Sequence, residues 1–149
     1  MKRAHFKETD FKDLKGKTIT KIEGAEVGSD RILFFCSDGS IYLMLHLFED
    51  DEEVYVENIS GEIQSIINSP ITMTEKVILM DCDMTEERKD LLERMKSMYV
   101  ASSYTWIWFK LSTETSEVMI RWFATSDFYA EDVFFREILY DENTKSYHY

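Results

Sequence analysis

The sequence predicts an α+β fold, namely a mostly antiparallel β-sheet with one short and one longer helix. Of the 149 residues, 44% are hydrophobic and 14% are aromatic, which is typical of a globular chain. Most apolar residues alternate with polar ones or form runs of strand length, and helical spacing occurs in few places. No repeat, low-complexity tract or linker divides the chain, so we expect a single domain over residues 1–149.

The N-terminal segment, residues 1–17, is basic and stands apart from an acidic remainder. Phe6, Phe11 and Leu14 are spaced so that a short helix or turn lays one apolar edge on the core. Gly16 is expected to end that element.

Four strands follow, and their order predicts an antiparallel meander. They are expected at residues 18–22, 31–36, 41–48 and 54–59. Ser, Asp, Gly and Ser between the second and third strands are typical of a hairpin turn, because Gly tolerates positive φ. An acidic bend precedes the fourth strand.

Two segments carry helical spacing. Residues 60–68 predict a two-turn helix that Pro70 ends, and residues 71–79 return to strand. A cap residue followed by acidic residues opens a longer helix at residues 85–98. Its expected buried stripe consists of Leu91, Leu92, Met95 and Met98.

The last third predicts a second meander, with strands at residues 104–111, 117–123 and 132–139 and a frayed tail at residues 141–149. In the first of these strands Trp106 and Trp108 share one face, and the other face is also apolar. Burial on both sides is therefore expected. The alternative is that the tryptophan face is partly open and forms a contact patch, since Trp is enriched in binding hot spots.

Charge restricts the class of partner. Seventeen Lys and Arg against 29 Asp and Glu give a net charge of −12, which disfavours direct contact with nucleic acid and with anionic lipid. Two cysteines fit a reducing compartment, and neither an apolar leader nor a run of about 20 apolar residues is present. We therefore expect a cytoplasmic chain that needs no cofactor and whose partners are proteins.

The strongest local anomaly is a run of five adjacent carboxylates, which with Glu57 and Glu62 makes seven acidic residues without an intervening Lys or Arg. Such a run is typical of a solvated loop. A Ca²⁺ site is a second interpretation, although the Asp-x-Asp-x-Asp-Gly pattern is missing. The third is a surface that meets a cationic protein groove built for nucleic acid. On that interpretation the partner-binding residues are Glu49, Asp50, Asp51, Glu52, Glu53, Glu57, Glu62, Trp106 and Trp108.

No pattern of residues assigns a catalytic group or a metal ligand. His5 and His148 are terminal, and His46 falls in an expected strand. Asp81 and Asp83 precede a helix and are interpreted as cap and dipole partners. The five glycines form neither a phosphate-binding loop nor a nucleophile elbow.

Several short motifs resemble a family of small phage and prophage proteins of unknown function. The matching pieces are Ser-Asp-Gly-Ser at residues 37–40, Val-Tyr-Val-Glu-Asn-Ile-Ser-Gly-Glu at 54–62, Pro-Ile at 70–71, and the Trp strands near 106 and 122. Family members often carry adjacent cysteines before the Val-x-Ile stretch, where this chain has acidic residues, so no thiol or metal role is carried over. The resemblance implies a phage accessory protein and assigns no catalytic residue.

Together these patterns predict a non-enzymatic phage protein that binds and inhibits a host protein, such as a nucleic-acid-binding enzyme or a defence nuclease. The acidic surface would act as a nucleic acid mimic, as in an anti-defence or anti-CRISPR inhibitor. The alternatives are a metal-assisted enzyme that uses the Asp and Glu clusters and a structural, self-assembling accessory protein.

Overall fold

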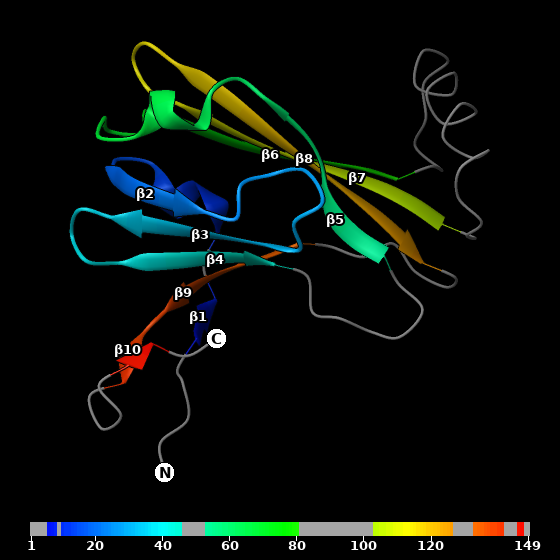
Figure 1. Cartoon of the computed structure of the whole chain (residues 1–149), viewed down its shortest axis with the longest axis horizontal. Coiled ribbons are helices and arrows are strands. Elements are labelled where there is room, and N and C mark those ends of the chain that lie inside the picture. The colour runs from blue at the N-terminus through cyan, green and yellow to red at the C-terminus, as the bar shows by residue number, and fades with distance from the viewer. Residues whose placement is uncertain are drawn as a thin grey trace.

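The computed structural model describes residues 6–8, 10–45, 53–80, 103–126, 133–141 and 146–147, which form two main β-sheets packed face to face (Figure 1). The five-stranded sheet has the order β1-β9-β4-β3-β2. Its strands are β1 (Phe6–Glu8), β9 (Phe134–Ile138), β4 (Ile41–Leu45), β3 (Arg31–Cys36) and β2 (Ile19–Glu23). The four-stranded sheet has the order β5-β8-β7-β6, and its strands are β5 (Glu53–Ser60), β8 (Glu117–Ser126), β7 (Ser103–Ser112) and β6 (Met73–Met80).

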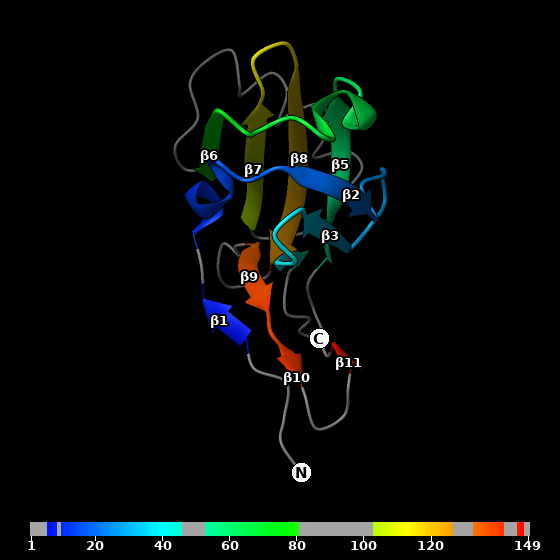
Figure 2. The same cartoon turned by 90° about the vertical axis from the view of Figure 1, so that its left-hand side faces the viewer.

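All of these strand pairs are antiparallel. A small ribbon of β10 (Tyr140–Asp141) and β11 (Ser146–Tyr147) follows β9. In Figure 2 strand β2 runs across the strands of the four-stranded sheet, so the two layers cross rather than align.

The hairpin predicted across residues 37–40 is confirmed. Strands β3 and β4 pair in a register that joins Phe34 to Tyr42 and Phe35 to Ile41. Gly39 occupies the turn at φ 88°, a left-handed conformation that a residue with a Cβ atom adopts only with strain.

One hydrophobic core fills the space between the two sheets. Trp122 of β8 is fully buried there, and its Nε1 donates a hydrogen bond to the Sδ atom of Met44 in the facing sheet, at 3.2 Å. The 3₁₀ turn η1 (Phe11–Leu14) adds Phe11, whose ring contacts Phe109 and Phe135 with centroid distances of 4.9 and 5.5 Å. Two residues of the apolar edge expected near the N-terminus, Phe11 and Leu14, are therefore buried between the sheets, whereas Phe6 belongs to strand β1 and not to this turn.

The predicted α+β class is wrong. The described residues are β-strands, turns and two 3₁₀ turns, η1 and η2 (Ile63–Ile66), and none of them forms an α-helix. The two-turn helix expected at residues 60–68 stops after one turn, because Ile67 is extended and Asn68 is left-handed at φ 67°. The Asn68 N–H donates to the carbonyl of Ile19 at 2.8 Å, so β2 uses a backbone group that a second turn would need. The helix expected at residues 85–98 lies outside the described residues.

Both predicted meanders are also wrong in their last strand. β5 leaves the first set of strands and pairs with β8, and β9 leaves the second set and pairs with β4 and β1. Alternation places side chains on one face or the other but does not select the neighbouring strand, so each meander exchanges its final strand with the other sheet. No helix in the described part of the chain has the length and apolar character to cross a membrane.

Candidate functional site

The outer face of the four-stranded sheet, turned away from the five-stranded sheet, brings together three of the residues that the sequence singled out. Glu57, Trp106 and Trp108 all lie on this face, because the alternate residues of β7 point into the core. Glu62 is exposed and lies apart, immediately before η2. Glu53 opens β5 opposite Thr125, whereas residues 49–52 lie outside the described residues.

Strand register arranges this outer face in rows that cross the sheet. The strand pairing places Tyr55, Phe123, Trp106 and Leu79 in a first row. The second row contains Asn58, Arg121, Trp108 and Val77, and Glu57 lies next to it at the irregularity where β5 shifts its register on β8. The third contains Ser60, Met119, Lys110 and Glu75. The face thus changes from aromatic to charged along the strands.

In the first row Phe123, Trp106 and Leu79 are buried, and Tyr55 is half-buried. Trp106 is 1% exposed, and its ring lies 5.3 Å from that of Phe123, which is fully buried. Trp108, two residues further along β7, is only partly buried. The two tryptophans therefore differ: the indole of Trp106 offers no surface to a partner, and the indole of Trp108 does.

An ion pair occupies the second row. The Nη2 atom of Arg121 lies 2.7 Å from Oε1 of Glu57, and the two side chains are 26% and 13% exposed. Burial raises the pKa of the Glu57 carboxyl, and the positive charge of Arg121 acts in the opposite direction. Removing either partner would leave the other charge poorly solvated. The two side chains therefore stay paired and keep their positions beside Trp108.

Beside the pair is a shallow hollow of about 270 Å³, here called the Trp108 groove. It is lined by Glu75, Val77, Trp108, Lys110 and Met119. Lys110 is held by Glu117, with 3.4 Å between Nζ and Oε2, whereas Glu75 makes no ion pair with any residue that the structure describes. An aromatic surface, an unpaired carboxylate and apolar walls form a site suited to a cationic side chain.

Sequence reasoning missed Glu75, Val77 and Arg121. The alternation of Met73, Glu75 and Val77 within one strand places them on a common face. That the face adjoins Trp108 depends on β6 pairing with β7, which no local pattern specifies.

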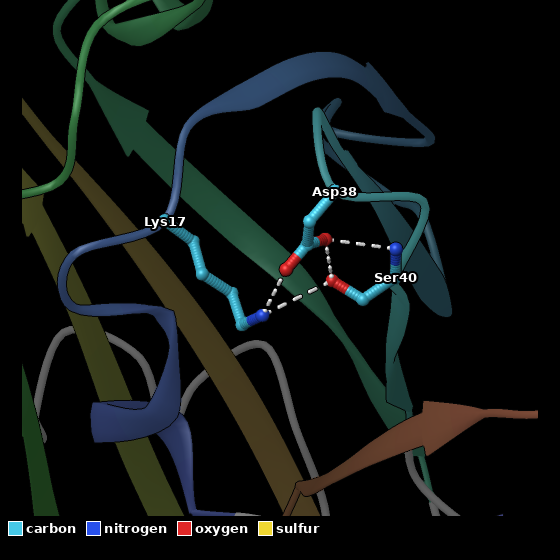
Figure 3. Close-up of polar contacts among 3 residues, drawn as sticks. All are labelled: Lys17, Asp38 and Ser40. Carbon is cyan, nitrogen blue, oxygen red and sulfur yellow. Dashed lines mark hydrogen bonds and ion pairs between the residues drawn. The ribbon is translucent and has the colours of Figure 1, made fainter.

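A second polar cluster joins the β3–β4 turn to the segment after η1 (Figure 3). The Asp38 carboxylate accepts from Lys17 Nζ at 2.5 Å, from Ser40 Oγ at 2.5 Å and from the Ser40 N–H at 2.9 Å. These contacts hold the pKa of Asp38 well below its usual range, and the Asp38 carboxylate raises that of Lys17. The lysine therefore stays protonated and cannot act as a base toward Ser40, so this arrangement fastens a turn and is not a Ser-Lys catalytic pair.

Within the described residues, no three His, Cys, Asp or Glu side chains gather in a way that could hold a metal ion. No protein-family model, no curated protein and no solved structure matches this chain. The case for function consequently depends on the groove and on charge.

Proposed function

We propose that this chain is a non-enzymatic inhibitor that binds a basic, nucleic-acid-binding protein of a bacterial host, in the host cytoplasm. The observation that carries the proposal is the Trp108 groove, where a partly open indole adjoins Glu75, whose carboxylate has no ion-pair partner among the residues that the structure describes. The resemblance to small phage and prophage proteins supplies the class of target.

Net charge supports a cationic partner. A chain at −12 attracts a basic groove over long range, which speeds encounter, and the attraction is screened over about 8 Å at physiological ionic strength. Open tryptophan side chains are among the residues that contribute most to protein interfaces. On this proposal the acidic residues increase the association rate and orient the chain on its target, and Trp108 makes a close contact in the complex.

The test starts with a pull-down from bacterial lysate at low salt, followed by purification of the captured protein. Its affinity for the chain should fall steadily with added salt, and its own DNA or RNA should compete with the chain. One variant replaces Asp50, Asp51, Glu52 and Glu53 by Asn or Gln, which neutralises the acidic run. This variant should inhibit the target less than the parent chain does.

A matched control changes net charge equally at exposed positions outside the acidic run, by neutralising Glu23, Glu26, Asp30 and Glu114. If the two variants lose affinity to the same small extent, net charge alone explains the salt dependence and the acidic run is no binding surface. Simultaneous binding of nucleic acid and of this chain to the target would refute mimicry.

A further inference from the structure

Among the described strands, β6 lies at an edge of the four-stranded sheet. It pairs with β7 on one side, and no described strand pairs with its other side. The opposite edge of the sheet is covered, because Val56 of β5 exchanges backbone hydrogen bonds with Gly28 and Ser29 at 2.7 and 2.8 Å. An uncovered edge presents a row of backbone donors and acceptors to any extended chain.

This edge carries exposed apolar side chains on both sides of the charged residues Glu75 and Lys76. Met73, Val77 and Ile78 are 42%, 38% and 45% exposed, so half of the six exposed large hydrophobic residues among those described lie on one strand. Natural edge strands are usually short, covered or charged; β6 has eight residues and carries Glu75 and Lys76 near its middle. A strand of this kind favours pairing with another segment.

A hollow lies beside each face of β6. The Trp108 groove adjoins its outward residues Glu75 and Val77, and its inward residues Thr74 and Lys76 line a cleft of about 660 Å³ together with residues of η1 and β9. Successive side chains of a strand point to opposite faces, so a segment paired with β6 would direct alternate side chains toward the two hollows.

We propose that β6 accepts an extended segment of the target protein as a fifth strand, and that a Lys or Arg of this segment lies across Val77 with its cation over Trp108 and beside Glu75. This inference rests on the proposed function and names the chemistry of its contact. Main-chain hydrogen bonds would provide pairing, and the basic side chain would provide selectivity.

The distance to be spanned and the charge of the groove favour a Lys or Arg side chain in the bound segment. The added strand would lie two strand spacings, about 10 Å, from β7, which carries Trp108. Lys and Arg have apolar stems long enough to cross Val77 and end in a cation that suits an indole and a carboxylate. Lys110 lies 3.4 Å from Glu117, and Glu75, its cross-strand neighbour, makes no ion pair with a described residue and is therefore open to that cation.

The probe is a fluorescent peptide, Thr-Val-Thr-Val-Arg-Val-Thr-Val-Thr, titrated by anisotropy at low salt up to about 1 mM. The same peptide with Glu in place of Arg should bind at least about tenfold more weakly, from the combined loss of the ring and carboxylate contacts. A version with alternate amides N-methylated should lose binding, because it cannot pair with the edge. Hydrogen exchange should slow at backbone amides within residues 73–79.

Val77→Lys places a cation of this chain in the groove and should weaken binding of the Arg peptide by about tenfold or more. Val27→Lys is the matched control, since Val27 is 65% exposed in a loop away from β6 and its replacement adds the same charge. Circular dichroism and urea unfolding establish that both variants are folded.

Three outcomes would overturn the inference. They are equal affinity for the Arg and Glu peptides, slowed hydrogen exchange at amides outside β6 only, and equal affinity of the two lysine variants for the Arg peptide. Self-association of the chain that Val77→Lys abolishes would also overturn it, because a second copy would then occupy the edge. If Val77→Lys leaves binding of the captured target unchanged while neutralising the acidic run abolishes it, this inference fails, and inhibition through the acidic run stands without any part for the Trp108 groove. If the peptide binds as expected but no basic protein competes, the edge is real and the proposed function fails.

Discussion

The Lys17–Asp38–Ser40 cluster predicts a specific dependence of stability on pH. Asp38→Asn keeps the shape of the side chain and removes its charge, so it weakens contacts from Lys17 and from the Ser40 hydroxyl and amide. Hydrogen bonds to a buried charge contribute about 1.5–3 kcal/mol and an exposed ion pair about 0–1 kcal/mol. Because the Asp38 side chain is 52% exposed, we expect a cost of about 1–2 kcal/mol in the free energy of unfolding at pH 7.

The sign of the pH effect follows from the lowered pKa of Asp38 in the folded chain. Its contribution is fully present above the unfolded value of about 3.9 and is lost as the pH falls toward the folded value. Lys17, whose pKa is raised, stays protonated throughout this range, so the change on the acid side belongs to Asp38. The parent should lose stability faster than Asp38→Asn below about pH 5.

Urea unfolding across this pH range measures the effect, and a double-mutant cycle with Lys17→Met isolates the coupling between the two side chains. Asp30→Asn is the control, because the Asp30 side chain is 76% exposed and lies 3.7 Å from Arg31; we expect a change below about 0.5 kcal/mol. Parallel pH profiles for the parent and Asp38→Asn would refute the reasoning, as would equal stability of the two at pH 7.

Three further predictions concern the fold. Gly61→Ala should cost clearly more than Gly39→Ala in urea unfolding, because both positions have positive φ but only at Gly61 would a Cβ atom approach a backbone oxygen of β8, at 2.5 Å; equal costs would contradict this. Trp122→Ala should destabilise by about 3–5 kcal/mol, and a loss below about 1 kcal/mol would show that this side chain is not in the core. Arg121→Met should destabilise the chain and raise the pKa of Glu57 further, as followed by carboxyl NMR; an unchanged titration would mean that the two groups do not interact.

Some residues of the site could be predicted from the sequence, and others could not. Trp108 and Glu57 stand out in the sequence as an aromatic residue in an alternating strand and as part of an acidic stretch. The sequence does not show that Trp108 and Glu57 lie near each other, because this requires β5, β8 and β7 to be neighbours in the observed register. Trp106 has the same local pattern as Trp108 and a different environment, since exposure depends on what packs over each row.

The sequence by itself determined most of the strands, the β3–β4 hairpin and the acidic character of the chain. These follow from alternation, from a glycine in a turn that needs positive φ, and from composition, all of which are local. The tertiary structure alone decided the exchange of β5 and β9 between the sheets, the single 3₁₀ turn at Ile63–Ile66 and the edge position of β6 among the described strands. Strand neighbours and competing backbone hydrogen bonds, such as the one from Asn68 to β2, are contacts between distant segments, and no local pattern encodes which segment will be there.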